Sequence, residues 1–509
     1  MTRDPANLPA SIVPGSPGSA SAGTVRRWQW LLAIAVLFQA LAFQGWRALY
    51  SPDEGRYTNV ALNMIESGDW MRPMLHPEVE HWAKPPLSYW SIAASIEAFG
   101  RTEFAARLPG ALAFGLTAIL LVRIGRRAVP EQPWLPAIVY ATSAFPSVAS
   151  NLVTTDNLLA LWETGQALAF LELWSAADER ARRLWRCLLW LAAALAFMTK
   201  GPPGLLALAA CILFAAIRER WAGVRRLFGR DALILFVVVG GAWYATVAAR
   251  EPGIWHYFLV EEVVNRVATD KMHRNAEWYG ALKVYAPTLL LGALPWWPFA
   301  IRRMLSARRG RNAPARDDAT LFLRCWILLP LAVFVLARSR LPLYILPLFA
   351  PLAVVMARAL APIDFRSVRL RIALCAWCAV LLGARIVPSY MHFEDDDRAL
   401  ADALRREAPA IPDEVAFVEI EPRFGLRFYL NSEVERLDLP GDAPNRRAQD
   451  IGSEMLEKEG CRLLVVPEKH LDRLDSYLAD HAIPYRRLPD ARGFAVLAQS
   501  TPDCEAYRP

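Results

Sequence analysis

The chain has 509 residues, 55% of them hydrophobic, and its mean hydropathy is positive at +0.21. This composition excludes a large soluble enzyme and predicts a polytopic α-helical membrane protein. The net charge of +7 conceals a split: residues 390–509 carry 16 basic and 25 acidic side chains, a net of −9, so residues 1–389 carry +16. Nucleic acid is a poor partner for that basic body, because its arginines are spread over short loops instead of forming one patch.

The chain is predicted to begin with a disordered cytoplasmic leader. Residues 1–24 are rich in Pro, Ser, Gly and Ala, a composition that buries too little apolar surface to fold. No cleavable signal peptide is expected, because the first apolar run is long enough to span a membrane and Ser51-Pro-Asp-Glu54 after it is no small-residue cleavage site. A transmembrane domain is therefore expected over residues 25–390.

Eleven apolar stretches are long enough to be candidate spans, and together they predict a bundle of eleven transmembrane helices. They cover residues 28–48, 105–122, 134–150, 157–174, 187–199, 203–217, 232–249, 279–301, 321–337, 341–357 and 372–388.

With the N-terminus in the cytoplasm, alternate loops carry the arginine clusters, as the positive-inside rule requires. These clusters lie at Arg123 with Arg126 and Arg127, and within 180–186, 218–230, 302–316 and 358–371. The remaining loops then face the periplasm, and they carry nearly every residue suited to chemistry. We therefore expect a protein of the bacterial inner membrane with its active site on the periplasmic side.

Two periplasmic loops are too long to be simple connectors. In loop 49–104, Tyr57, Val60, Ala61, Met64 and Ile65 form the apolar stripe of a helix, which we expect to lie in the membrane interface. Residues 87–99 form a second such segment in the same loop. Loop 250–278 is long and aromatic, and both loops are expected to border a cavity open to lipid.

From residue 391 the pattern changes to that of a soluble periplasmic α/β domain, residues 391–509. Strands are expected at 415–420, 427–430, 463–466 and 494–497, and helices at 397–407, 448–458 and 469–479. No glycine-rich phosphate loop opens these helices, so no nucleotide is expected. Cys461 and Cys504 share this domain and are able to form a disulfide in an oxidising compartment.

Carboxylates at the outer ends of spans are the first candidates for catalysis. Asp53 and Glu54 follow the first span beside Arg56, and such a pair is equally typical of a solvated helix end. Asp156 strengthens the functional interpretation, because acids embedded in a membrane are costly and tend to mark function. Two acids from separate segments then face one outward cavity.

Lysines give a second argument. Only six of the 57 basic residues are lysine, and two of them, Lys84 and Lys200, lie at the outer face next to Pro-Pro. A compact ammonium group there is suited to a phosphate, although a snorkelling interfacial lysine is the simpler alternative. Arg266 adds a fork for phosphate oxygens, and Tyr344 a hydroxyl at the same depth. Such a cation cluster indicates an anion, and a lipid phosphate is the economical candidate.

These motifs resemble the bacterial aminoarabinose lipid A transferase family, within the GT-C group that includes protein O-mannosyltransferases. The resemblance covers residues 28 to about 360 and rests on the order and spacing of short motifs. They are Asp53-Glu-Gly-Arg-Tyr57, Ser67-Gly-Asp-Trp70, Lys84-Pro-Pro-Leu-Ser-Tyr-Trp90, Thr155-Asp156, Thr199-Lys-Gly-Pro202, Trp278-Tyr279, Leu294-Pro-Trp296 and Leu341-Pro-Leu-Tyr-Ile-Leu-Pro347.

The resemblance implies an inner-membrane enzyme that moves a sugar from undecaprenyl phosphate to lipid A or another envelope acceptor, without a cofactor. It also implies thirteen spans, so the bundle is expected to have about 11–13 transmembrane helices. It implies that Asp53 is the main catalytic carboxylate and Asp156 a second cavity acid. The same resemblance implies that the donor phosphate is held by Lys84, Lys200, Arg266, Arg56 and Tyr344. Direct displacement predicts inversion at the anomeric carbon.

The chain departs from the family pattern at two positions. Family members tend to read Glu-Lys-Pro-Pro and Glu-His-x-x-Arg, where the first glutamate and the histidine are regarded as metal ligands. Here those positions are Ala83 and Val263, so we expect no metal there. The changed pocket wall leaves the sugar and the acceptor open.

Three alternatives remain from the sequence. A protein O-glycosyltransferase of the same fold would use the same donor chemistry on a protein hydroxyl. A lipid-linked sugar flippase would place ionisable residues near the bilayer midplane and often shows repeated halves, whereas these motifs lie at span ends and no repeat is present. A structural assembly protein would explain the soluble domain but leave the outer cations unexplained.

Overall fold

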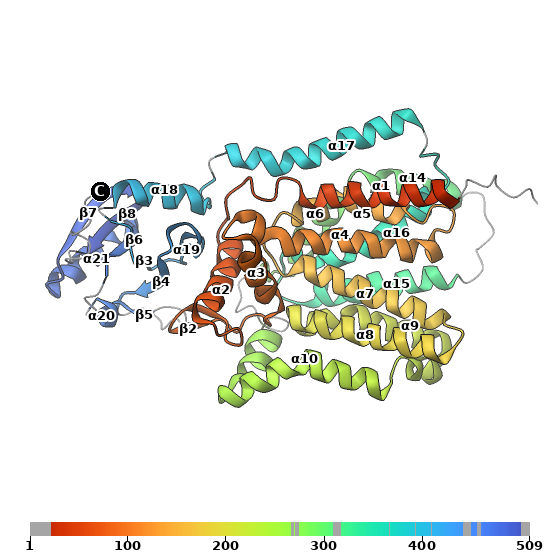
Figure 1. Cartoon of the computed structure of the whole chain (residues 1–509). Coiled ribbons are helices and arrows are strands. Elements are labelled where there is room, and N and C mark those ends of the chain that lie inside the picture. The colour runs from red at the N-terminus through yellow and green to blue at the C-terminus, as the bar shows by residue number, and fades with distance from the viewer. Residues whose placement is uncertain are drawn as a thin grey trace, which may run out of the picture.

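The computed structural model describes residues 22–265, 269, 274–308, 317–365, 367–391, 393–408, 410–440, 449–455 and 460–499. A long helical bundle occupies one end of the molecule and an α/β domain the other (Figure 1). Residues 1–21 of the predicted leader, 1–24, lie outside the described residues. Helix α1 begins at Ala22.

The bundle contains a helix or a pair of helices at each of the eleven predicted spans. Its elements are α1 (Ala22–Leu41), α4 (Glu103–Ala128), α5 (Leu135–Thr142), α6 (Ala144–Ala149), α7 (Asp156–Ser175), α8 (Glu179–Lys200), η1 (Pro202–Leu205), α9 (Leu206–Arg226), α10 (Arg230–Arg250), α11 (Ile254–His256), η2 (Tyr257–Val264), α13 (Gly280–Gly292), α14 (Trp296–Arg308), α15 (Asp318–Leu336), η3 (Pro342–Leu348), α16 (Phe349–Leu360), α17 (Val368–Ile386) and η4 (Val387–Tyr390).

Not every predicted span is a straight apolar helix. Among the described residues, six helices are long and apolar enough to cross a membrane, or seven if the pair α13 and α14, bent by 87°, is one span. The stretch 134–150 is broken at Ser143 into two short helices. Helix α7 carries acids and is packed between α4, α8 and α9 inside the bundle, so it needs little apolar surface of its own.

The outer helices expose the apolar surface that a lipid environment requires. On α10, Val237 and Val238 are 64% and 58% exposed, and on α17, Ile372 and Val380 are 64% and 59% exposed. Continuous apolar faces of this kind are rare on soluble monomers. Together with the spans, they make the chain a multi-pass membrane protein.

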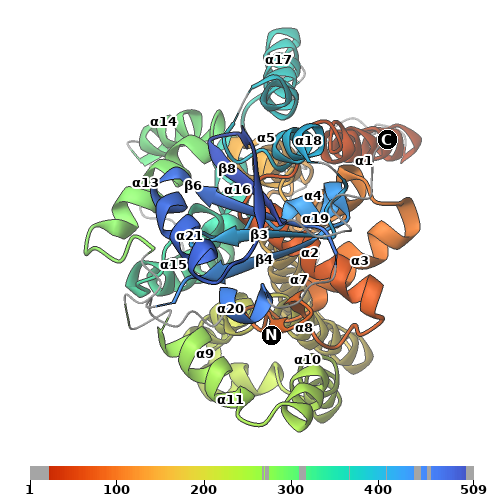
Figure 2. The same ribbon diagram turned by 90° about the vertical axis from the view of Figure 1, so that its left-hand side faces the viewer.

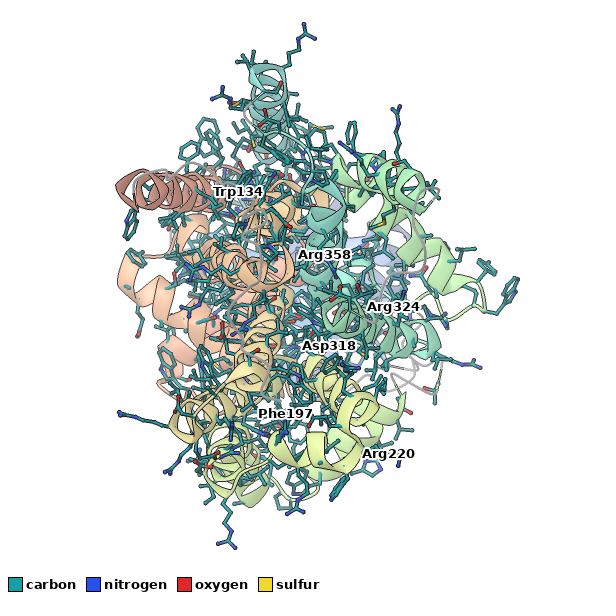
Figure 3. All side chains as sticks on the ribbon, turned by 90° about the vertical axis from the view of Figure 1, so that its right-hand side faces the viewer. Trp134, Phe197, Arg220, Asp318, Arg324 and Arg358 are labelled. Carbon is teal, nitrogen blue, oxygen red and sulfur yellow. The ribbon has the colours of Figure 1, made fainter. Side chains whose placement is uncertain are left out.

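The helix ends that carry the arginine clusters, as far as the clusters are described, lie at the end of the bundle far from the α/β domain (Figure 1). Arg220 and Arg358 are labelled at this end in Figure 3. Several are paired across helices there: Arg218 lies 2.6 Å from Asp318, and Arg358 pairs with Asp317. The ends of α7 and α8 that carry Asp156 and Lys200 are at the opposite end. The charge asymmetry predicted from the loops is therefore present in the fold.

The long first loop folds into α2 (Asp53–Ser67), the hairpin β1 (Met74–His76) and β2 (Val79–Glu80), and α3 (Leu87–Phe99). The predicted helix with an apolar stripe is correct, but its predicted position in the lipid interface is wrong. Val60 and Met64 are fully buried and pack against Leu400 and Leu426 of the α/β domain. The stripe therefore binds that domain instead of lipid.

The C-terminal domain is a six-stranded mixed sheet in the order β5-β4-β3-β6-β8-β7, viewed in Figure 2 with α21 in front. Strands β5, β4, β3 and β6 are parallel. Strand β8 is antiparallel to β6, and β7 pairs with β8 as an antiparallel hairpin. Its elements are α18 (Asp397–Glu407), β3 (Glu414–Val418), α19 (Gly425–Leu430), β4 (Glu433–Asp438), β5 (Gln449–Asp450), α20 (Ile451–Glu454), β6 (Arg462–Pro467), α21 (Glu468–Asp480), β7 (Tyr485–Ala491) and β8 (Phe494–Gln499).

One of the predicted strands in this domain is wrong. Residues 427–430 form part of helix α19, because Leu426 and Leu430 share one helix face that packs into the core below the sheet, and packing overrides the strand preference of a four-residue run. Within the range 448–458, where a helix was expected, Ile451–Glu454 form α20 and Gln449–Asp450 form strand β5, while residues 448 and 456–458 lie outside the described residues. Cys461 is disulfide-bonded, and five other cysteines are free. Cys504, its predicted partner, lies outside the described residues.

Candidate functional site

A cavity of about 600 Å³, including its open mouth, lies where the bundle meets the α/β domain. It gathers residues from segments nearly 300 positions apart in the sequence. Its wall is formed by Asp53, Arg56, Tyr57, His81, Ala83, Lys84, Thr154, Thr155, Asp156, Lys200, Arg274, Leu341, Leu343 and Tyr344. The structure thus brings together Asp53, Asp156, Lys84, Lys200 and the predicted partners Arg56 and Tyr344.

Asp156 and Lys200 form a buried ion pair at the base of this cavity. Asp156 is the first residue of α7 and Lys200 the last residue of α8, so each charge lies at the helix end whose dipole favours its sign. The Lys200 ammonium also lies 4.5 Å from the centre of the Tyr344 ring. These contacts fix the lysine in one place at the cavity wall.

Arg274 is a cavity cation that the sequence analysis missed. Its guanidinium donates a hydrogen bond of 3.1 Å to the Tyr344 hydroxyl. Buried Arg340 holds the segment, because its guanidinium donates to the carbonyls of Asn275 and Glu277 and its backbone N–H donates to the Arg274 carbonyl at 2.9 Å. The only sequence signal was its place near the end of loop 250–278.

Asp53 and Arg56 face the cavity from the first turn of α2. The Asp53 side chain is 45% exposed, and its Oδ1 lies 3.8 Å from the Arg56 guanidinium. That guanidinium also contacts Glu421 of the α/β domain at 3.0 Å. The C-terminal α/β domain therefore contributes to the electrostatics of the cavity rim.

Glu54, predicted together with Asp53 as a catalytic acid, is turned away from the cavity. It is 3% exposed and pairs with Arg47 and Arg107. Arg47 also donates to the Ala48 carbonyl, and Arg107 donates to the Arg47 carbonyl. Burial favours the neutral acid, but the two guanidinium groups outweigh it and lower the pKa of Glu54 to about 2. Its setting favours a structural role.

Lys84 also lines the cavity. Its ammonium donates to the Ala83 carbonyl at 2.7 Å and lies 3.6 Å from Glu262. Ala83, the first of the two positions that depart from the family pattern, lines the cavity without a ligand atom. The side chain of Val263 and all of Arg266 lie outside the described residues.

Comparison with known proteins identifies the family. The chain is 34% identical over 355 residues to an undecaprenyl phosphate-α-4-amino-4-deoxy-L-arabinose arabinosyl transferase of Sodalis glossinidius, covering 67% of this chain and 60% of that protein. It is 30% identical over 392 residues to the enzyme of that name from Aeromonas salmonicida, covering 74% of this chain and 70% of that protein. The chain belongs to this arabinosyl transferase family.

Two further comparisons agree with the family. The family model described as dolichyl-phosphate-mannose-protein mannosyltransferase matches residues 83–244. The crystal structure of ArnT from Cupriavidus metallidurans bound to undecaprenyl phosphate has a TM-score of 0.74 at 21% identity, covering 94% of this chain and 98% of that one. This likeness establishes the GT-C fold. In the first of the curated relatives, the matched part of the chain spans about 60% of the protein's length.

Proposed function

We propose that this family member is a membrane glycosyltransferase that moves a sugar from undecaprenyl phosphate to lipid A or another envelope acceptor. The main support is the cavity itself, in which four cations and two carboxylates from distant segments line one space beside the bundle. The names of the family relatives supply the donor and the sugar class. We further propose that the cavity opens to the periplasm, since the arginine-rich loops lie at the other end.

The cations are not equivalent for holding a donor phosphate. Lys200 is paired with Asp156, Arg56 contacts Asp53 and Glu421, and Lys84 lies near Glu262. Arg274 pairs with no carboxylate in the described part of the chain, and Tyr344 orients its guanidinium. We therefore assign Arg274 the first contact with the phosphate, with Lys84 and Lys200 adding charge from the sides.

This arrangement supplies what transfer from a polyprenyl phosphate needs. As the bond from the anomeric carbon to the phosphate oxygen breaks, negative charge builds on the leaving phosphate, and fixed Lys and Arg donors stabilise it without solvent reorganisation. The half-exposed Asp53 is placed to take the proton of an acceptor hydroxyl. With an anionic phosphate acceptor, Asp53 instead orients the acceptor or stabilises positive charge at the anomeric carbon.

A protein hydroxyl acceptor is the second candidate, because the matching family model is that of a protein mannosyltransferase. A mass spectrum of lipid A from cells with and without the gene separates the two. Loss of a sugar-sized adduct that the wild-type gene restores and Asp53→Asn does not restore would support lipid A as acceptor. An unchanged spectrum with confirmed expression would move the acceptor to another glycan or to protein.

A further inference from the structure

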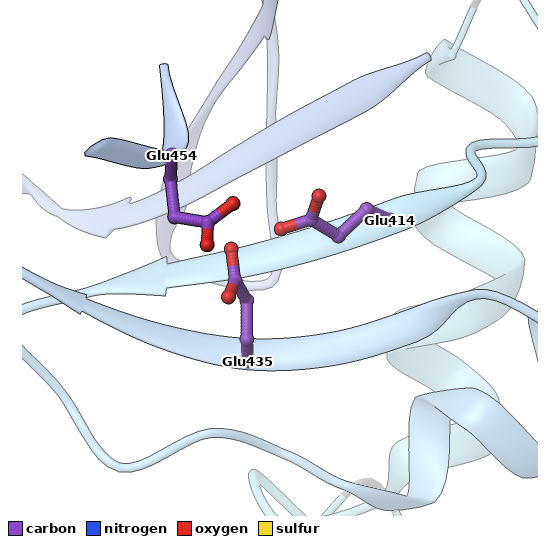
Figure 4. Close-up of side chains that lie close together, drawn as sticks. All are labelled: Glu414, Glu435 and Glu454. Atoms are coloured by element: carbon purple, nitrogen blue, oxygen red, sulfur yellow. The ribbon is translucent and has the colours of Figure 1, made fainter. Parts of the chain in front are cut away.

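The acids of the C-terminal domain lie in two kinds of surroundings. One group lies on β3, β4 and α20 and consists of Glu414, Glu435 and Glu454 (Figure 4). Arg462 of β6 contacts this group within the domain. Glu421, in the loop between β3 and α19, instead contacts Arg56 of α2, the helix that begins at Asp53. Glu421 thus links the domain directly to the cavity wall.

The loop that carries Glu421 is held on both sides. Before it, the Glu419 N–H donates to the Leu437 carbonyl at 3.0 Å, and the Glu419 carboxylate accepts a hydrogen bond of 2.6 Å from the Leu439 N–H. After it, Phe424 is 5% exposed and packs in the core of the domain. The position of Glu421 is therefore set by the fold of the domain.

The domain is docked tightly against the first turn of α2. Gly55 lies so close to the start of α19 that a Cβ atom on Gly55 would overlap the Gly425 nitrogen. Just before α2, the Ser51 N–H donates to the Asp395 carbonyl at 3.1 Å. These contacts hold Glu421 at one place beside the cavity rim.

Arg56 lies between two carboxylates. Its guanidinium donates a hydrogen bond of 3.0 Å to Glu421 Oε1, whereas Asp53 Oδ1 lies 3.8 Å away, beyond hydrogen-bond range. Asp53 and Arg56 are three residues apart on one helix, a spacing at which opposite charges attract each other. Without Glu421, the guanidinium would therefore be drawn to Asp53.

We propose that Glu421 is a positioning residue for sugar transfer, which holds the Arg56 guanidinium back from Asp53. This role rests on the proposed function, in which Asp53 meets the acceptor. A carboxylate that is closely paired with an arginine is a weaker base, because the pairing stabilises its charged form. The pairing also occupies the carboxylate oxygens. Glu421 keeps Asp53 available by binding Arg56 in its place.

A substrate-free structure of full-length Glu421→Gln tests the position of Arg56. Glutamine keeps the size of the side chain and removes its charge. The Arg56 guanidinium is expected to lie within about 3.2 Å of Asp53. Because Glu421 is 43% exposed, the unfolding midpoint should stay within about 2 °C of wild type. A guanidinium that keeps its wild-type position would overturn the proposal, whatever substrate the enzyme uses.

Kinetics test the consequence, with undecaprenyl phosphate-α-4-amino-4-deoxy-L-arabinose as donor and lipid A as acceptor. Glu421→Gln is expected to lower kcat about three- to fivefold, as for a half-exposed ion pair, and to leave the donor KM unchanged. Glu421→Asp, which keeps the charge, should restore most of the kcat. Glu468→Gln, a change of an exposed acid on α21, should leave both constants unchanged.

The outcomes separate this role from the proposed function. An active wild type with an unchanged kcat in Glu421→Gln would overturn the role of Glu421 and leave the proposed function in place. A higher donor KM together with a lower unfolding midpoint would also overturn it, because that pattern marks a structural residue. A wild-type protein that transfers no sugar would contradict the proposed function, and with it the role of Glu421 in transfer, but not the placement of Arg56.

Discussion

The cavity and the buried group around Glu54 lie at the same end of the bundle and start from adjacent residues, but their charges are satisfied differently. Glu54 is enclosed by Arg47 and Arg107 and accepts hydrogen bonds from the backbone N–H groups of Tyr50 and Val153. Asp53 has one guanidinium 3.8 Å away and remains 45% exposed. Complete pairing in a dry site holds the loop in shape, whereas incomplete pairing beside a cavity leaves charge for a ligand.

The different pairing of Asp53 and Glu54 predicts different outcomes for the isosteric changes Asp53→Asn and Glu54→Gln. The larger effect is expected from Asp53→Asn, on catalysis. Asp53→Asn should lower turnover by about 10²–10⁴-fold, the usual contribution of a positioned acid or base, while expression and thermal stability stay near wild type. Turnover of lipid-linked donor by purified protein measures this. Normal turnover would remove Asp53 from the mechanism.

Glu54→Gln should act on folding instead. Removing one partner from a buried ion network leaves Arg47 and Arg107 without their charge, at a cost of about 3–5 kcal/mol. The expected result is a large loss of folded protein in detergent, measured by size-exclusion yield and unfolding midpoint. A stable Glu54→Gln protein that lacks turnover would return Glu54 to the catalytic residues.

Substitutions of the cavity cations test whether a cation without a carboxylate partner contributes more to donor binding than a paired one. Arg274→Ala should raise the KM for the lipid-linked donor by about 10–100-fold, because a hydrogen bond to a charged group contributes about 1.5–3 kcal/mol. Lys84→Ala should have a smaller effect in the same direction, since Glu262 already lies near its ammonium. Arg324→Ala, an exposed arginine on α15, is the matched control. An unchanged donor KM in Arg274→Ala would refute its contact with phosphate.

The smallest effect is expected on thermal stability, at the contact between the C-terminal α/β domain and the loop that carries Asp53. The Ser51 hydroxyl shares its one proton between the two carboxylate oxygens of Asp397, at 2.8 and 2.9 Å, and Asp397 is fully buried. Burial raises the pKa of Asp397 from 3.8 to about 8, against the opposing hydrogen bond from Ser51. A raised carboxyl pKa stabilises the fold below pH about 4, and that contribution is lost as the pH rises toward 8.

The unfolding midpoint of the full-length protein should therefore fall by a few degrees between pH 5 and pH 8.5. Asp397→Asn, which is neutral at every pH, should show a smaller fall over the same range. Identical pH profiles for the two proteins would mean that Asp397 does not titrate in this range in the folded state.

Sequence alone was enough for the features that depend on local pattern. Apolar runs predicted the helical stretches of the bundle, and the arginine loops predicted its charge asymmetry. The positions of Asp53, Asp156, Lys84 and Lys200 at span ends predicted that they share one cavity, which all four line. These features follow from the hydrophobic effect and from the cost of charge in lipid, which act on each segment separately.

Tertiary structure decided what depends on the orientation of a side chain or on distant partners. Asp53 and Glu54 are adjacent in sequence, and only the packing of Arg47 and Arg107 determines which of them faces the cavity. Arg274 meets Tyr344 across 70 positions, and the Glu414, Glu435 and Glu454 group forms only when the strands pair. No local pattern contains these contacts, because each arises from surfaces that become complementary only after the chain has folded.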